Sequence, residues 1–173
     1  MTRRSLPLLA LALTLSAGAV RCGDVDVAKT IVVTDVFSGY YDDGVVADGV
    51  YAGQNRLLPS IMFKLKNVGE DPLAGLQLTV SFWPDGADGE KDSREVRGIG
   101  STALAPGATT DEITVRAGVG YTSEAARADF FALSAFKDWT ARLFAKRSGR
   151  IVPIGVYTID RRLLPHQRDS KTP

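Results

Sequence analysis

The sequence has very little of the side-chain chemistry on which most enzymes and disulfide-rich proteins depend. Its 173 residues include one cysteine, Cys22, and one histidine, His166. A lone cysteine excludes an intramolecular disulfide. The wide separation of the two residues in the chain disfavours a thiol–imidazole pair and a zinc site. P-loop and dinucleotide-binding glycine motifs are also missing. We therefore expect no cofactor, no metal and no enzymatic activity, with a hydrolase that uses two carboxylates as the residual alternative.

An excess of charge of either sign is missing as well. The chain carries 21 Lys and Arg against 20 Asp and Glu, for a net charge of +1 at pH 7. This balance argues against a protein whose main partner is nucleic acid. Hydrophobic residues make up 45% of the chain and charged residues 24%, which indicates a globular protein rather than a disordered one. The length suits one domain.

Long hydrophobic runs are confined to the N-terminus. Arg3 and Arg4 precede an apolar run over residues 6–19, and residues 17–19 read Ala-Gly-Ala. This order of a basic segment, an apolar segment and small residues is typical of a secretory signal peptide. The run is shorter than the roughly 20 residues that span a bilayer. We predict a signal peptide over residues 1–19, the alternative being a buried N-terminal helix, and a bacterial protein that is periplasmic or anchored in the envelope.

Cys22 lies just beyond this signal, in a predicted linker of residues 20–29. Its position resembles that of the lipidated cysteine of bacterial lipoproteins, although Arg21 occupies a place where those signals have a small residue. Two alternatives stay open: a lipid anchor at Cys22, which would be the protein's membrane contact, or a free thiol near the N-terminus. A lipid chain would tether the domain to a membrane without embedding it.

The strongest pattern in the chain is an alternation of apolar and polar residues within residues 58–85. Such a period of two predicts strands with one buried face. A turn-rich segment at residues 67–72 separates the two alternating runs, so we predict that they pair as an antiparallel hairpin. The side chains predicted to form the centre of the core are Ile61, Phe63, Leu65, Leu76, Leu78, Val80 and Phe82.

Further strands are expected over residues 30–37, 93–99, 109–116, 138–146 and 150–160. Pro153 should place the last of these at a sheet edge or a bulge, and residues 123–130 should hold one short helix or helical loop. The predicted fold is an all-β, immunoglobulin-like antiparallel sandwich of two sheets with about seven or eight strands. It should span residues 30–160 as a single domain, followed by a flexible tail over residues 161–173.

Two segments break the strand pattern and are the candidate ligand-binding loops. Residues 38–53 are rich in glycine and aspartate, and residues 117–137 are rich in aromatic rings. The alternative interpretation of the first segment is a plain turn. The alternative for the second is a segment that covers an open edge or end of the sandwich. The candidate ligand-binding residues in these segments are Tyr40, Tyr41, Asp42, Asp43, Tyr121, Phe130 and Phe131.

An acidic loop at residues 85–92 is a weak candidate for calcium. Its possible ligands are Asp85, Asp88, Glu90 and Asp92. Calcium takes six to eight oxygen ligands, but the spacing of these residues does not match an EF-hand. The alternative is an ordinary exposed hairpin loop.

A small basic patch with one aromatic ring occupies the predicted strand 138–146 and its end. It consists of Arg142, Phe144, Lys146 and Arg147. A solvated strand face is one interpretation. For an exported protein the other is contact with anionic lipid headgroups rather than with nucleic acid.

Four features of the central segment resemble bacterial immunoglobulin-like domains of the FxLYD type. They are a strand that ends in asparagine at residues 63–67, a turn at 69–73, a strand that ends in phenylalanine at 76–82, and a Leu-Ala-Pro-Gly turn at 104–107. The resemblance covers residues 58–116. Extra residues at 85–89 and the segments 38–53 and 117–137 depart from the family pattern.

The resemblance implies an exported, non-catalytic accessory or interaction domain and transfers no catalytic residues. We therefore expect an envelope accessory domain that binds another envelope protein. The alternative function is a periplasmic ligand-binding domain for carbohydrate, lipid or Ca²⁺ that uses the loops 38–53 and 117–137.

Overall fold

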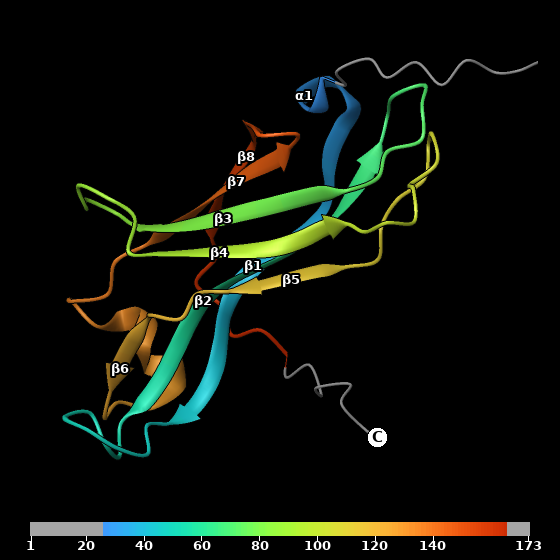
Figure 1. Cartoon of the computed structure of the whole chain (residues 1–173). Helices are drawn as coiled ribbons and strands as arrows, with labels where there is room; N and C mark the ends of the chain where they lie inside the picture. The colour runs from blue at the N-terminus through green and yellow to red at the C-terminus, as the bar shows by residue number, and fades with distance from the viewer. Residues whose placement is uncertain (1–25, 166–173) are drawn as a thin grey trace, which may run out of the picture.

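The computed structural model describes residues 26–165, which form two antiparallel four-stranded sheets packed face to face (Figure 1). The predicted all-β, two-sheet sandwich is therefore confirmed. The elements in chain order are α1 (Val27–Thr30), β1 (Ile31–Val45), β2 (Asn55–Asn67), β3 (Leu76–Pro84), β4 (Asp92–Ile99), β5 (Ile113–Arg116), β6 (Tyr121–Ser123), the 3₁₀ helix η1 (Arg127–Ala132), β7 (Trp139–Arg147) and β8 (Arg150–Ile159).

The first sheet is built around β2, the longest strand after β1. β1 pairs along one edge of β2, and β5 and β6 pair in turn along its other edge. The interruption between β5 and β6 requires Gly120, because an added Cβ would lie 2.0 Å from the backbone oxygen of Leu57. The second sheet has the order β4-β3-β7-β8.

The predicted hairpin of residues 61–66 with 76–83 is wrong in its pairing. Both segments are strands, but β2 belongs to the first sheet, whereas β3 pairs with β4 and β7 in the second. The turn-rich segment that joins them crosses between the sheets instead of folding one strand back on the other. Two strands that face each other across a core bury the same alternate side chains as two paired strands.

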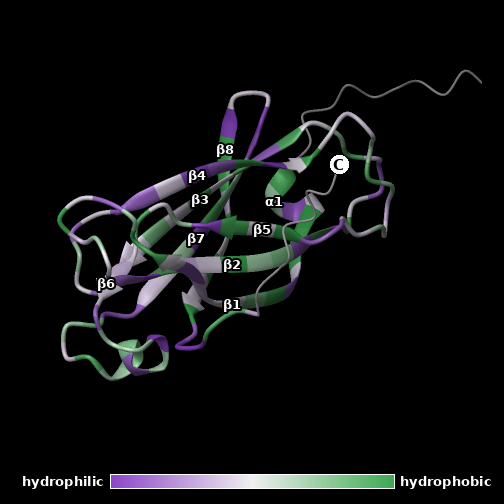
Figure 2. Ribbon diagram, turned by 90° about the horizontal axis from the view of Figure 1, so that it is seen from below, coloured by the Kyte–Doolittle hydropathy of each residue, from purple (hydrophilic) through white to green (hydrophobic). Residues whose placement is uncertain are grey.

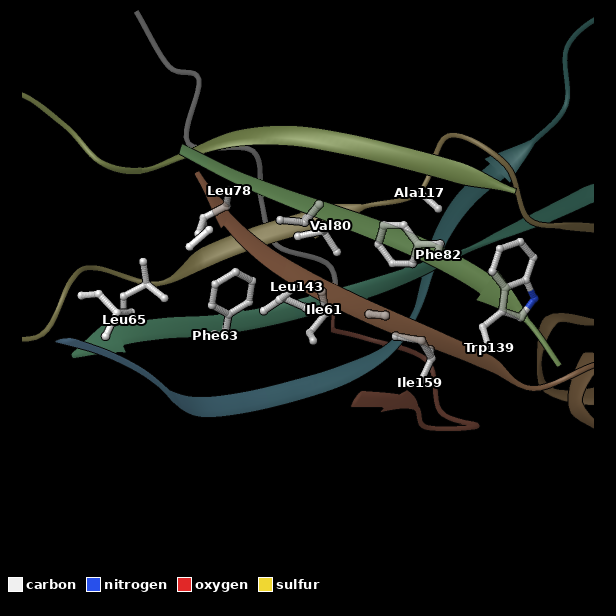
Figure 3. Packing of buried hydrophobic residues seen from close by; sticks show 14 of the residues in the cluster. Ile61, Phe63, Leu65, Leu78, Val80, Phe82, Ala117, Trp139, Leu143 and Ile159 are labelled. Atoms are coloured by element: carbon white, nitrogen blue, oxygen red, sulfur yellow. The ribbon is translucent and has the colours of Figure 1, made fainter. Parts of the chain in front are cut away.

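The core lies between the sheets and is formed by the side chains predicted from the alternation. Figure 3 shows the residues of β2 pointing toward those of β3 and β7. The side chains with no exposed surface include Ile61, Phe63, Leu65, Leu76, Leu78, Val80, Phe82 and Leu143. The orientation of these strands is thus confirmed although the partner of β2 is not.

The crossing between β2 and β3 is held by the buried side chain of Asn67. Its Nδ2 donates to the carbonyl oxygens of Asp71 and Leu104, both at 2.9 Å, and its Oδ1 accepts from the Gly69 backbone N–H at 2.9 Å. Gly107 donates its N–H to the Asn67 carbonyl oxygen at 2.8 Å. The asparagine at the end of β2 therefore joins the crossing segment to the Leu-Ala-Pro-Gly turn far along the chain.

β1 is longer than predicted, because the glycine-rich segment 38–53 continues the strand as far as Val45. Its pairing with β2 is interrupted after Thr34, where Asp35 has a φ of 51°. Gly39 lies inside the strand, where a Cβ would come within 2.8 Å of the Arg162 carbonyl oxygen. The glycine that suggested a turn instead permits close approach of another chain segment.

β7 and β8 form the predicted final hairpin around a two-residue turn, in which Ser148 and Gly149 have φ values of 49° and 80°. This is the backbone geometry that tight hairpins favour. The predicted position of Pro153 is also confirmed. β8 is an edge strand, and its pairing with β7 shifts between Phe144–Pro153 and Leu143–Gly155.

The chain after β8 does not leave the domain at once, which corrects the predicted flexible tail for its described part. The Tyr40 backbone N–H donates to the Arg162 carbonyl oxygen at 2.8 Å, and the Leu164 N–H donates to the Tyr40 oxygen at 2.8 Å. Residues 162–164 thus run along the edge of β1, and Leu164 is buried. At the other terminus, the end of the predicted linker forms α1, where Val27 is buried.

The predicted signal peptide, Cys22, His166 and residues 166–173 lie outside the described residues. Between residues 26 and 165, no helix combines the length and the apolar character needed to cross a bilayer. The expected short helix near residues 123–130 is found a few residues later, as η1.

Candidate functional site

The predicted aromatic ligand-binding loop closes one end of the sandwich. Tyr40 and Phe130 have no exposed surface, although both were candidates for ligand contact. The Phe136 ring lies 5.2 Å from that of Tyr40, 5.3 Å from that of Phe131 and 4.5 Å from that of Tyr121, measured between centroids. Aromatic rings at such separations form a packed cluster. The segment 117–137 therefore covers the end of the core, as one of its two interpretations foresaw.

Tyr40 shows how deeply this cluster is buried. Removal from water raises the pKa of its phenol well above the ordinary value. Its hydroxyl group has no hydrogen-bond partner within the described chain. Tyr121, in contrast, is partly exposed, and its hydroxyl accepts from the Lys137 N–H at 2.6 Å and donates to the Lys137 oxygen at 2.9 Å. Both tyrosines are thus built into the fold.

The adjacent carboxylates Asp42 and Asp43 serve separate ion pairs. Asp42 pairs with Arg127 of η1, and Asp43 pairs with Arg56 of β2. Asp42 also accepts a hydrogen bond from the Gly44 N–H at 2.9 Å. Tyr41 is covered on one face by the Arg116 guanidinium, which lies 3.5 Å from the ring centroid. Tyr41, Asp42 and Asp43 are therefore each engaged by a different arginine of the domain.

The acidic loop at residues 85–92 does not gather its carboxylates. Asp92 accepts from the Gly118 N–H at 2.6 Å and pairs with Arg94 at 2.8 Å. Within residues 26–165, no three side chains of the metal-binding types come together as a cation site would need. Asp88 and Glu90 instead border an open groove of about 640 Å³ whose floor includes Trp139.

The β1–β2 hairpin ends in a tip, residues 45–54, which overlaps the second half of the candidate ligand-binding loop 38–53. Its apolar side chains are exposed: Val45 to 56%, Val50 to 90% and Tyr51 to 54%. In Figure 1 the tip projects at the end of the molecule opposite the β7–β8 turn. Exposed apolar groups on a projecting hairpin are a feature of contact surfaces.

The outer side of the second sheet carries the basic patch that the sequence indicated. Arg142, Phe144 and Lys146 alternate with buried neighbours along β7 and so share its outer face. Gln77 of β3 pairs with both Lys146 and Arg97, which brings Arg97 of β4 into the same row. The patch is thus wider than the sequence suggested. We call Arg97, Arg142 and Lys146 the basic face; Arg147 follows Lys146 in β7 and by alternation belongs to the other side of the strand.

No protein-family model matches the chain, and no curated protein matches it. Among solved structures, a Northeast Structural Genomics Consortium target is 14% identical, over 84% of this chain and 98% of its own, with a TM-score of 0.42. A Bordetella pertussis protein provisionally named ApaA is 18% identical, over 76% of this chain and 93% of its own, with a TM-score of 0.37.

Proposed function

We propose that the chain is an exported, non-catalytic accessory domain of the bacterial cell envelope that binds another envelope protein through the β1–β2 tip. The observation that carries this proposal is the exposure of three apolar side chains on one projecting hairpin, Val45, Val50 and Tyr51. Burial of apolar surface is the main driving force of most protein association. Tyrosine is also among the residues enriched at the centres of interfaces.

The tip is held in one conformation by its own backbone hydrogen bonds. The Gly53 N–H donates to the Val46 oxygen and the Val46 N–H to the Gln54 oxygen, both at 2.9 Å. Gly49 and Gly53 have φ values of 82° and 84°, which the turn requires and glycine adopts at little cost. A preformed contact surface loses less conformational entropy on binding than a flexible one.

Export is supported by the signal-peptide pattern of residues 1–19. The accessory role is supported by the FxLYD-type features of residues 58–116. One of these features, the asparagine that ends β2, has a clear structural role. The side chain of Asn67 joins the β2–β3 crossing to the Leu-Ala-Pro-Gly turn.

Site-specific photocrosslinking in producing cells tests the proposal. A photoreactive phenylalanine derivative replaces Val50 or Tyr51, and the matched control replaces Val68, which is 48% exposed on the β2–β3 crossing. We expect defined protein adducts from positions 50 and 51 but not from position 68. Adducts that are absent from the tip, or equal at all three positions, would reject the tip as the contact surface.

A second candidate function, carbohydrate binding, is favoured by one observation in the groove beside the acidic loop. Trp139 lines this groove, and its buried indole N–H has no acceptor within residues 26–165. A sugar hydroxyl would supply that acceptor once the indole turned its N–H, which is buried in this structure, toward the groove. Titration with maltotriose and chitotriose, followed by NMR at the two indole N–H signals, should shift Trp139 and leave Trp83 unchanged. If neither signal moves, this second function is rejected.

A further inference from the structure

The outer side of the second sheet gathers positive charge from two strands that are distant in the sequence. Arg97 comes from β4, whereas Arg142 and Lys146 come from β7. The pairing of Gln77 with both Arg97 and Lys146 places one cation on each side of β3 in a single row across the sheet. Glu95, which pairs with Thr79, is the acidic residue on the same side of β4.

The cations of the basic face differ from most others in the domain because no carboxylate neutralises them. Arg56, Arg94, Arg127, Arg161 and Arg162 each pair with an aspartate. Within residues 26–165, the three cations of the basic face have no carboxylate within ion-pair distance. Arg97 and Arg142 are also exposed to solvent. A surface with a net positive charge therefore faces the solvent.

Two exposed aliphatic side chains adjoin this charge. Ile151 pairs with Lys146 and is 59% exposed, and Val156 pairs with Arg142 and is 65% exposed. Both lie on β8, the edge strand of the sheet. Figure 2 shows the β7–β8 turn projecting from the sandwich with hydrophilic residues on its arms. Cations beside apolar side chains are the combination that binds at the surface of an anionic bilayer, where headgroups attract the charge and acyl chains accept the apolar groups.

We propose that the outer side of the second sheet docks on a bilayer that contains anionic lipids. The basic face would contact the headgroups, while Ile151 and Val156 would enter the interface. This surface is separate from the β1–β2 tip, and it would add a second membrane contact to any lipid at Cys22.

The exposed apolar groups favour a bilayer over single-stranded nucleic acid. Nucleic acid binding to a sheet depends on open aromatic faces on which bases stack. Trp83 does not offer one, because the Arg142 guanidinium lies 4.0 Å from its ring centroid and its indole N–H is bound to Ser81 at 2.9 Å. The most exposed apolar side chains of this surface, Ile151 and Val156, are aliphatic.

The test measures partition of the full chain onto vesicles of phosphatidylglycerol and phosphatidylcholine in equal parts. In one variant, Arg97→Gln, Arg142→Gln and Lys146→Gln are combined. The control combines Lys29→Gln, Lys66→Gln and Lys137→Gln, which removes the same charge from other surfaces. Every variant keeps residues 1–25, so any binding by the N-terminal hydrophobic run is common to all.

Each basic residue near an anionic surface contributes roughly fivefold to partition, so the triple variant of the basic face should bind roughly 100-fold more weakly. The control should bind within about threefold of wild type, because its cations are spread over other surfaces. Equal loss in both variants would overturn the proposal in favour of a general effect of net charge. No loss in either would overturn it outright.

A second variant tests the proposal independently, in case the triple variant of the basic face does not fold. Ile151→Ser combined with Val156→Ser should also weaken binding to the anionic vesicles, whereas Val45→Ser combined with Val50→Ser should not. Oligothymidylate is titrated in parallel. If the basic-face variant loses affinity for this oligonucleotide but not for vesicles, the surface is a nucleic-acid site and the membrane proposal is wrong. Crosslinking from position 50 reports on the proposed protein contact separately.

Discussion

Replacement of Asn67 by alanine should lower the free energy of unfolding by about 3 kcal/mol. The side chain of Asn67 has no exposed surface and makes three hydrogen bonds of 2.9 Å, to Gly69, Asp71 and Leu104. A hydrogen bond of this kind contributes about 1 kcal/mol net, and its loss leaves the partner groups unpaired. For a domain of this size, the change corresponds to a fall of roughly 10 °C in Tm.

Urea unfolding followed by tryptophan fluorescence measures the effect, with Lys66→Ala as the neighbouring control. Lys66 is exposed, so its replacement should change stability by less than about 0.5 kcal/mol. Asn67→Asp should be worse than Asn67→Ala, because it keeps the acceptor for Gly69 but turns a buried charge toward two carbonyl oxygens. If Asn67→Ala unfolds within about 0.5 kcal/mol of wild type, the crossing is not held by this side chain.

Phe63→Ala and Leu78→Ala should each cost about 2–5 kcal/mol, because both side chains are fully buried between the sheets; unchanged melting of either variant would contradict the assigned inward orientation. Gly120→Ala should destabilise the junction of β5 and β6, because the added Cβ would lie 2.0 Å from the Leu57 oxygen, and urea unfolding equal to wild type would show that no such contact exists. Tyr40→Phe should stabilise the domain by about 1 kcal/mol, since it removes a buried hydroxyl that lacks a partner. Burial raises the pKa of Tyr40 above 10.0, so the wild type should lose stability as the pH rises past that value, where the unfolded chain releases a proton that the folded chain retains. Unfolding curves at about pH 8 and about pH 11 should therefore diverge more for wild type than for Tyr40→Phe.

The strands and their buried faces could be predicted because alternation is a local property. Phe63 and Leu78 each lie in a run whose neighbours fix the orientation of the side chain. The pairing of strands is not local, since β2 and β3 bury the same faces whether they pair or oppose each other. One feature of the sequence did argue against a β2–β3 hairpin. The connecting segment, residues 68–75, is longer than a tight hairpin turn.

The candidate sites were harder to predict because they depend on contacts distant in sequence. Tyr40 was expected to meet a ligand because glycines and aspartates surround it, but β1 continues through this segment and turns Tyr40 into the core. Gly39, which suggested a loop, accommodates Arg162 from the other end of the chain. Arg97 could not be joined to Arg142 and Lys146 from the sequence, since only the order of β4, β3 and β7 brings them together.

The attachment of residues 162–164 to the edge of β1 constrains the order in which the parts of the domain can fold. The backbone of Tyr40 obtains its partners from Arg162 and Leu164, which the ribosome adds more than a hundred residues later. Until then, the edge of β1 has unpaired backbone groups at this point, and such edges invite association with other chains. Contacts between residues so far apart in sequence also form slowly. The domain can therefore complete this edge of β1 only after residues 162–164 have been synthesised.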